Sequence, residues 1–401
     1  MHLLFVTQES GKIPSGVITV LDHLCQCWPE SDGITILMNP THWHGAELQQ
    51  RLTKKNLDFE SVPFLLSDDW INNGVSQLPQ AFRILIRIIL LPFVVLQSLL
   101  LLVWLIVWMR KNKISGILSH NGGWPGGRLN RWVIYAGYLA LVPERVLVIH
   151  NTPHISGFFI RKYFSNFSGR LIGWLATRIV TVSRACRESL ELKGEFGRSL
   201  EVIYNGIHNT PRRSSEYCME TLPWGKKYPT IAFVGELHPR KGVHVLLEAL
   251  QSVDTECELV LIGNGTPVYT AELKAMANQL NHPVNFLGFR DDVQMLYRWV
   301  DVLVLPSLNF ESFGMVIIEA MRAGVSVICS DFGGMKEVVA DGETGFVVPA
   351  GDSRALANAI DRLLGDEGLR IRMGESGRRR MEKRFSSSTM TENYVRLFHA
   401  Q

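Results

Sequence analysis

The sequence lacks the cysteine patterns of zinc-binding and redox proteins. Its six cysteines are scattered along 401 residues, and the closest pair, Cys25 and Cys27, is separated by one residue. Common zinc and redox motifs place two residues between such cysteines, so we expect reduced, structural thiols in a cytosolic protein. The first residues also lack a basic segment followed by an apolar core, and we expect no secretory signal.

An excess of charge of one sign is also missing. The chain has 41 Lys and Arg residues against 38 Asp and Glu residues, which gives a net charge of +3. This balance is too mild for a nucleic-acid-binding surface, and no RNA- or DNA-binding motif is present. We therefore expect no nucleic-acid partner, whereas a membrane surface or a small anionic substrate is compatible with this charge.

Two motifs of cofactor-binding proteins are absent as well. The chain contains no D-x-D tripeptide, and its one H-x-H, His42-Trp43-His44, is more typical of a surface loop than of a metal site. We therefore predict no metal and no other cofactor, so that positive side chains and helix dipoles would stabilise a bound diphosphate. The stretch LIGNGT (261–266) lacks the third glycine of a dinucleotide fingerprint, which disfavours a nicotinamide-dependent oxidoreductase.

Short apolar runs alternate with helical segments along most of the chain. This pattern predicts an α/β fold with open parallel sheets, covered by helices on both faces. We predict two such domains, an N-terminal one over 1–210 and a C-terminal one over 211–386, joined by a polar linker near 205–230. The predicted strands are 3–7, 34–38, 115–119, 145–149, 179–182 and 200–204, then 230–234, 258–262, 284–287, 302–305, 325–329 and 346–348. Ligands of such sheets bind beyond the carboxyl ends of the strands, which predicts a site in the cleft between the domains.

A long apolar segment interrupts the first domain at 84–109. No residue from Ile88 to Met109 is charged, and this length is sufficient to cross a membrane. However, the strands before and after it are predicted to share one sheet, which a single crossing forbids, and Pro92 should kink or break a helix. We expect one or two apolar helices that dock at a membrane interface, with ordinary buried helices as the alternative.

Two basic residues follow the first strand of the second domain. The stretch GELHPRKG (235–242) places Arg240 and Lys241 just before a helix that is expected to begin near Val243. Two cations beside a helix N-terminus suit a diphosphate group, although two solvated loop residues would give the same sequence pattern.

Two glutamates stand eight positions apart in the stretch 302–339. Glu311 lies in a predicted loop, and Glu319 lies in a predicted helix from about Met315 to Arg322. Such a pair can perform acid–base chemistry on a sugar, hold a ligand, or cap a helix. Because Glu319 stands among apolar residues, it needs a partner, and a diol could donate two hydrogen bonds to it.

The start of that helix provides a second binding element. The backbone N–H groups of Phe313, Gly314 and Met315 should lack helical partners, and such groups can bind an anion without using side chains. A later loop, SDFGGMKE (330–337), is expected to bring Gly333-Gly334 to the same edge.

The first domain has fewer candidate residues. Gly16, after the first strand, would allow the backbone to approach a phosphate or a sugar. His120 and His150 each stand at the end of a predicted strand, where a histidine is structural about as often as it is functional.

Together these motifs resemble the retaining glycosyltransferases of family 4, which have two Rossmann-like domains in the GT-B fold. The resemblance is based on FVGELHPRKG, LIGNGT, the block Glu311–Glu319, DFGGMKEVV with GETGFVVPAGD, and VSRACRESL with VIYNGI. It covers residues 180–355 well and the first half of the chain loosely. Ser15 departs from the family, which often has a second glycine beside Gly16.

The resemblance implies a role for each candidate residue of the second domain. Arg240 and Lys241 would bind the donor diphosphate, and Glu319 would hold the donor ribose. Glu311 would contact the transferred sugar, and residues 313–315 would supply backbone contacts.

In the first domain, the resemblance implies that Gly16 lies near the donor phosphate and His120 near the reacting sugar. It also implies that the last helix, about 387–399, crosses back onto the first domain.

The implied function is retaining, metal-independent transfer of a sugar from a UDP- or GDP-sugar to a glycan or lipid-linked acceptor. The apolar segment suggests bacterial surface polysaccharide or lipopolysaccharide synthesis by a cytoplasmic protein, peripheral on the inner face of the cytoplasmic membrane. Two alternatives are a nucleotide-sugar hydrolase or phosphorylase with the same fold, and a non-catalytic membrane-associated partner protein.

Overall fold

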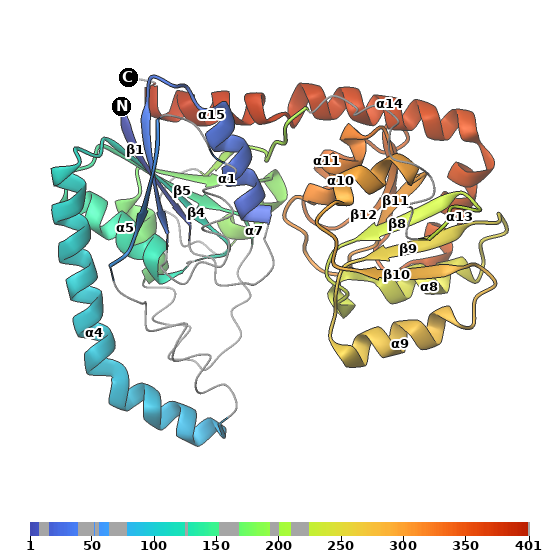
Figure 1. The fold of residues 1–401 in the computed structure, drawn as a ribbon, viewed down its shortest axis with the longest axis horizontal. Helices are drawn as coiled ribbons and strands as arrows, with labels where there is room; N and C mark the ends of the chain where they lie inside the picture. The colour runs from blue at the N-terminus through green and yellow to red at the C-terminus, as the bar shows by residue number, and fades with distance from the viewer. Residues whose placement is uncertain are drawn as a thin grey trace. The chain divides into compact units, whose positions relative to one another are not determined.

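The computed structural model describes residues 1–7, 16–38, 52, 56–63, 78–124, 127–151, 168–192, 200–209 and 224–399. His42 and His44, Ser15, Cys218 and most of the expected linker lie outside these residues. The chain divides into two compact units (Figure 1). The N-terminal unit comprises Met1–Val182, Cys186–Ile203 and Thr391–Gln401, and the C-terminal unit comprises Ser183–Ala185 and Tyr204–Met390.

The N-terminal unit contains a parallel sheet with the strand order β3-β2-β1-β4-β5-β6-β7. The six strands predicted from the sequence are confirmed, but the sequence analysis missed β3. The strand β3 lies at the edge and is only half-buried, because its residues LDFES alternate between apolar and polar. The strands are β1 (His2–Thr7), β2 (Gly33–Met38), β3 (Leu57–Ser61), β4 (Gly116–Asn121), β5 (Glu144–Ile149), β6 (Arg178–Thr181) and β7 (Glu201–Val202).

Helices cover this sheet and connect its strands. Helix α5 (Arg128–Leu139) packs against β1, β4 and β5, whereas α1 (Gly16–Cys27) joins β1 to β2. Helix α7 (Arg184–Glu191) follows β6. The last helix, α15 (Ser387–His399), begins in the C-terminal unit and ends in the N-terminal unit. There the ring of Phe398 lies 6.0 Å from that of Trp28, and His399 Nε2 lies 3.0 Å from Asp32 Oδ2.

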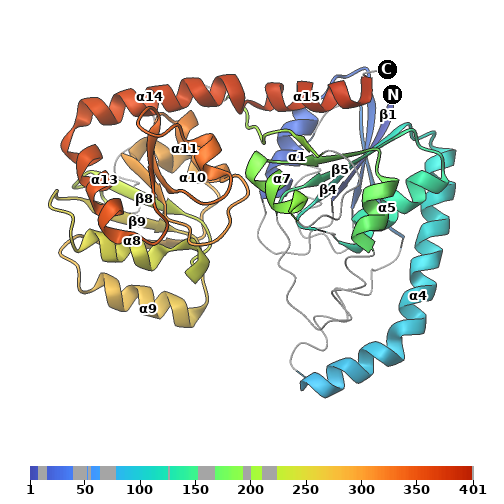
Figure 2. The ribbon, with the colours of Figure 1, turned by 180° about the vertical axis from the view of Figure 1, so that it is seen from behind.

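The C-terminal unit contains a second parallel sheet, with the order β10-β9-β8-β11-β12-β13. All six predicted strands are confirmed within one residue at either end. Figure 2 shows that α8 and α9 lie on one face and α10 and α11 on the other. The strands are β8 (Thr230–Val234), β9 (Glu258–Ile262), β10 (Val284–Gly288), β11 (Val302–Leu305), β12 (Ser326–Ser330) and β13 (Gly345–Val348). The helices are α8 (Val243–Leu250), α9 (Pro267–Ala277), α10 (Val293–Leu296), α11 (Met315–Arg322), α12 (Met335–Val338), α13 (Ser353–Gly365) and α14 (Glu367–Arg384).

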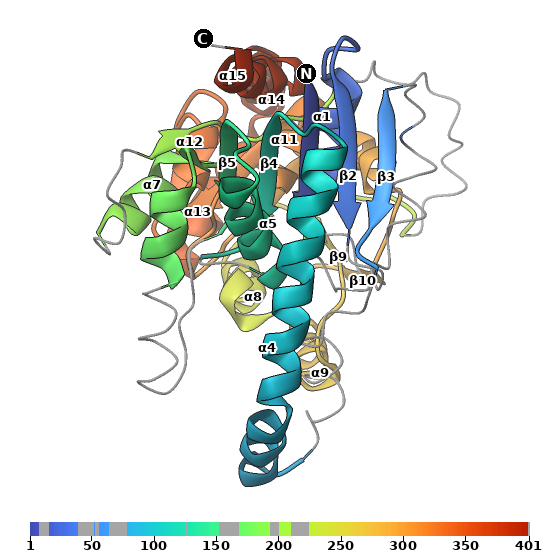
Figure 3. The same ribbon diagram turned by 90° about the vertical axis from the view of Figure 1, so that its left-hand side faces the viewer.

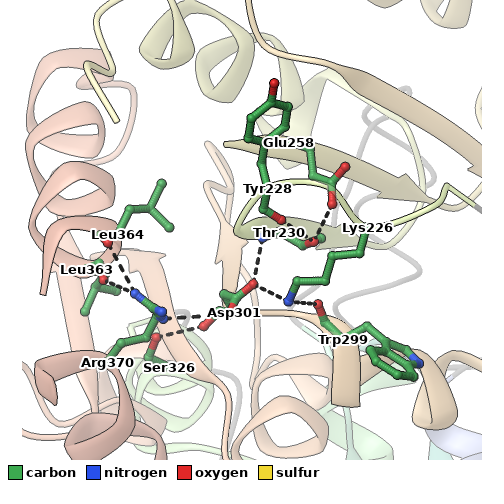
Figure 4. A network of polar contacts seen from close by, with 10 residues as sticks. All are labelled: Lys226, Tyr228, Thr230, Glu258, Trp299, Asp301, Ser326, Leu363, Leu364 and Arg370. Carbon is green, nitrogen blue, oxygen red and sulfur yellow. Dashed lines mark hydrogen bonds and ion pairs between the residues drawn. The ribbon is translucent and has the colours of Figure 1, made fainter. Parts of the chain in front are cut away.

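A partly buried network around Asp301 joins the amino ends of these strands (Figure 4). Asp301 precedes β11, and its Oδ2 accepts hydrogen bonds from Lys226 Nζ and from the backbone N–H of Thr230, each at 2.7 Å. Arg370 of α14 lies 3.8 Å from the other carboxylate oxygen, and Ser326 donates to the Asp301 carbonyl. The network joins the starts of β8, β11 and β12, so it stabilises the sheet at the end opposite to the candidate site.

The apolar segment forms α4 (Gln80–Lys111), one continuous helix of 32 residues that includes Pro92. Of the two expected effects of Pro92, the structure shows the kink and not the break, since Figures 1 and 3 show that the first turns are inclined to the rest. Among the described side chains of α4, the buried ones lie in its second half and include Leu101, Leu105 and Met109, and α5 is its neighbour. Among the described residues, 88–111 form the one helix that is long and apolar enough to span a membrane.

Candidate functional site

The two predicted cations lie on a short turn between β8 and α8. Residues Pro239–Lys241 form a single 3-10 turn, in which His238 Nδ1 accepts a hydrogen bond from the backbone N–H of Arg240. Gly242 ends the turn with φ of 71°, in the left-handed region that glycine adopts without strain. Helix α8 begins at the next residue, as predicted from the sequence.

This turn is fixed against the loop that follows β11. A Cβ atom on Gly242 would lie 1.9 Å from the carbonyl oxygen of Pro306, so only glycine permits this approach. The backbone N–H of Leu308 donates to the carbonyl of Arg240 at 2.9 Å. These contacts bring the basic turn next to the loop that carries Glu311.

Lys241 and Glu311 form a largely buried ion pair between Nζ and Oε2. Their side chains are 13% and 21% exposed. Arg240 Nη2 lies 3.1 Å from Glu236 Oε2, and the side chains of this second pair are 36% and 56% exposed. The sequence placed Lys241 and Glu311 in one site but did not predict that they would bind each other. A phosphate oxygen could replace the Glu311 carboxylate as the partner of Lys241, because both are anionic oxygen acceptors.

The N-terminus of α11 lies beside this pair. Gly314 precedes the helix with φ of 87°, and its carbonyl accepts from Ile317 at 2.9 Å. The Phe313 side chain is buried against Tyr204 and Phe385, so only its backbone is suited to contact a ligand. Met315 is the first helical residue, and N–H groups of a first turn have no partner within the helix.

The glycine pair at 333–334 packs onto the Glu311 loop, as expected. Gly333 has φ of 63°, and a Cβ atom there would lie 2.1 Å from the carbonyl oxygen of Glu311. The backbone N–H of Gly334 donates to that same carbonyl at 2.8 Å. The second loop therefore holds the backbone of Glu311 in place.

Glu319 lies one turn inside α11 and is half-buried. Burial raises the pKa of its carboxyl group to about 7, although Arg322 and the hydroxyl of Tyr297 act in the opposite direction. The hydrogen bond from Tyr297 Oη is long, at 3.4 Å. The carboxylate therefore retains acceptor capacity for further donors, such as a diol.

In the N-terminal unit, the structure places the two histidines together. His120 is 1% exposed, and its Nδ1 lies 2.9 Å from Nε2 of His150, whose ring is stacked on it at 5.2 Å. His150 is only partly buried, so it is the residue of the pair that retains exposed surface. Gly16 is the exposed first residue of α1, and the loop before it lies outside the described residues.

Two residues that the sequence analysis did not single out also belong to these regions. Glu337 accepts hydrogen bonds from the backbone N–H groups of Arg184 and Ala185 and from Tyr204 Oη, at 2.7–2.9 Å. The first turn of α7 has no acidic residue of its own, and this was the one feature of the sequence that could have indicated a carboxylate from elsewhere in the chain. Tyr394 of α15 lies with its ring 6.2 Å from that of His120, and no local pattern indicated this contact.

The two parallel-sheet units define the GT-B fold, and the comparison with solved structures agrees. The structure of Anabaena Alr3699/HepE in complex with UDP covers 100% of both chains with a TM-score of 0.76 and 21% identity. Residues 218–380 match the family "Glycosyl transferases group 1".

Curated relatives support the same family. The chain is 34% identical over 244 residues to the phosphatidyl-myo-inositol mannosyltransferase of Mycobacterium leprae (strain TN), covering 58% of this chain. It is 32% identical over 173 residues to the Staphylococcus aureus capsular polysaccharide biosynthesis glycosyltransferase CapM, covering 42% of this chain. The matched segments span 62% and 45% of the length of these relatives, respectively.

Proposed function

We propose that the protein is a glycosyltransferase that moves a sugar from a nucleotide diphosphate sugar to a hydroxyl group of an acceptor. One observation carries this proposal. Lys241 pairs with Glu311 just before α11, and Glu319 lies one turn inside this helix, all within the segment that matches the group 1 glycosyl transferases. UDP in the Anabaena structure supports a uridine nucleotide as the donor, with a GDP-sugar as the second choice.

Each site residue has a task in this reaction. The Glu319 carboxylate would accept hydrogen bonds from the two ribose hydroxyls, while Lys241 and Arg240 would bind the diphosphate. The helix dipole of α11 and the N–H groups of Gly314 and Met315 would add to the stabilisation of the leaving charge. When Lys241 turns to the phosphate, Glu311 is released to accept hydrogen bonds from the transferred sugar.

We propose that the transfer retains the anomeric configuration and uses no metal. The support is the family resemblance together with the absence of a D-x-D tripeptide from the sequence. Proton NMR of the first product decides the configuration, since the anomeric coupling of the new linkage must match that of the donor. Activity that disappears with EDTA and returns with added Mg²⁺ would contradict the metal-independent mechanism.

We further propose a lipid-linked glycan acceptor, reached by a peripheral protein on the inner face of the cytoplasmic membrane. Much of the first half of α4 is apolar and exposed, including Leu85, Ile88, Phe93 and Leu96. Basic residues end the helix at 110–111, in a position to bind phosphate head groups. Because β3 before α4 and β4 after it belong to one sheet, docking fits this unit better than crossing.

The donor is tested first. Thermal denaturation with a panel of nucleotide sugars should show a raised melting temperature only for those that bind the native site. A binding nucleotide sugar is then supplied with lipid extracts, and the sugar transferred to lipid is counted. Release of free sugar or sugar phosphate without an acceptor would instead indicate a hydrolase or a phosphorylase.

The membrane is tested separately by sedimentation with anionic vesicles. A variant with Phe93→Ser and Leu96→Ser should lose vesicle binding and keep nucleotide binding. Its matched control is Val268→Ser, which changes an exposed apolar residue of α9 in the other unit. Unchanged sedimentation of the α4 variant would contradict docking through this helix.

A further inference from the structure

Three rings lie together in the N-terminal unit, and they include two buried polar atoms without a hydrogen-bond partner. His120 lies in β4, His150 follows β5, and Tyr394 belongs to α15. His120 Nδ1 and His150 Nε2 are 2.9 Å apart, and the ring centroids of His120 and Tyr394 are 6.2 Å apart. His120 Nε2 and Tyr394 Oη are buried, and neither forms a hydrogen bond with any described residue.

One proton lies between His120 Nδ1 and His150 Nε2 and forms the hydrogen bond that joins the two rings. Burial lowers the pKa of both rings, that of His150 to about 4, so both are neutral at pH 7. A neutral imidazole carries its proton on one nitrogen and a lone pair on the other. Either His120 donates from Nδ1 to His150, or His150 donates from Nε2 to His120.

Counting donors distinguishes the two arrangements. If His150 donates, the proton of His120 lies on its buried Nε2, which then offers no lone pair to the Tyr394 hydroxyl. The Tyr394 O–H is then a buried donor with no acceptor, which is costly. If His120 donates, its Nε2 becomes an acceptor that the Tyr394 O–H can reach through a small shift or one water molecule. Only this second arrangement leaves no buried donor unsatisfied.

We propose that Tyr394 and His120 form a relay that fixes the proton of His150 on Nδ1. His150, which is only partly buried, then offers its Nδ1–H as a neutral donor to an oxygen atom of the transferred sugar. The inference rests on the proposed glycosyl transfer, in which His150 touches the substrate and His120 and Tyr394 are positioning residues. It reassigns His120, which the family resemblance placed near the reacting sugar, to a buried place behind His150.

The relay makes a specific spectroscopic prediction. Long-range ¹H–¹⁵N correlation spectra of the labelled full chain should show both His120 and His150 with the proton on Nδ1. Tyr394→Phe removes only the hydroxyl, so the protein should fold, and His150 should become a mixture of both tautomers. His150 with its proton on Nε2 in the unchanged protein would overturn the relay.

Kinetics test whether the proton position matters for transfer. We expect His120→Phe to lower kcat by about 10- to 100-fold, with the donor KM changed by less than about twofold. We expect Tyr394→Phe to lower kcat by about three- to tenfold. In His120→Asn, the amide replaces Nδ1 as the donor to His150, so this variant should retain most of the activity. A purely structural role would instead lower the melting temperature of both His120 variants without this difference in kcat.

The two experiments also separate the relay from the proposed function. If the protein transfers no sugar from any nucleotide sugar, the tautomers still decide whether the relay exists. If it transfers sugar and His150 carries its proton on Nε2, the relay fails and the glycosyltransferase assignment stands.

Discussion

The candidate residues of the two units differ in charge, since Lys241 and Glu311 of the C-terminal unit are ionised and the histidines of the N-terminal unit are neutral. In the C-terminal unit, charged side chains from distant loops pair with each other, as Lys241 and Glu311 do. In the N-terminal unit, the candidates are neutral imidazoles, and burial keeps them uncharged. The difference is consistent with the proposed chemistry, because a diphosphate binds cations, whereas a neutral imidazole can donate a hydrogen bond to a sugar oxygen.

The largest effect on turnover is expected from replacing Lys241, the less exposed of the two cations in the C-terminal unit. Lys241→Ala should cost about 2–4 kcal/mol of transition-state stabilisation, measured as kcat/KM with the best donor. Arg240→Ala should cost less, because the guanidinium group is more exposed and already paired with Glu236. The control is Lys274→Ala on α9, an exposed lysine outside the site. Unchanged turnover in Lys241→Ala would refute the diphosphate assignment.

A second test compares a substitution in each unit for its effect on UDP affinity and on kcat. Glu319→Ala should weaken UDP binding by about tenfold, since it removes the acceptor for two ribose hydrogen bonds. His150→Phe should leave the Kd for UDP unchanged and lower kcat by about 10- to 100-fold. Isothermal titration and initial rates measure the two quantities. If both variants lost UDP affinity equally, the division of tasks between the units would be wrong.

The pH dependence of nucleotide binding should arise from the C-terminal unit. The pKa of Glu319 is about 7 without ligand, and ribose hydroxyls donate to the ionised form. Affinity should therefore be highest above pH 7 and fall as the pH drops through 7, by up to about tenfold per pH unit. Titrations with UDP between pH 5.5 and 8.5 measure this slope. Glu319→Gln should bind more weakly and show no such slope.

The last comparison concerns two glycines that have similar backbone conformations. Gly324 has φ of 78° with no atom near its missing Cβ, whereas a Cβ on Gly242 would strike the carbonyl of Pro306. We expect Gly324→Ala to cost about 1 kcal/mol of unfolding free energy and Gly242→Ala about 2–3 kcal/mol. Urea unfolding measures both. Only Gly242→Ala should also weaken UDP binding, because it displaces the turn that carries Lys241.

The sequence predicted the framework because local patterns determine it. The buried strands are continuous apolar runs, and α11 was predicted with its exact bounds because Gly324 ends it. The exception, β3, has alternating polar residues at a sheet edge, which a search for apolar runs does not detect. Helix α4 continues past Pro92 with its first turns inclined to the rest, so this proline bends the helix without ending it.

The contacts within the candidate sites were less predictable, because they join residues far apart in the chain. Lys241 and Glu311 are 70 positions apart, and His120 and His150 are 30 apart. Local periodicity carries no information about such pairs. The sequence indicated that each residue lies at the carboxyl end of a strand, but only the packed structure shows which side chains meet.

Helix α15 has a consequence for how the protein is made. Its residues 391–399 complete the N-terminal unit, yet the ribosome adds them after every residue of the C-terminal unit. Until then, Trp28 lacks the ring of Phe398 and His120 lacks that of Tyr394. The unit synthesised first is therefore the last to finish its core, and a nascent chain that stops short of residue 391 leaves that core open.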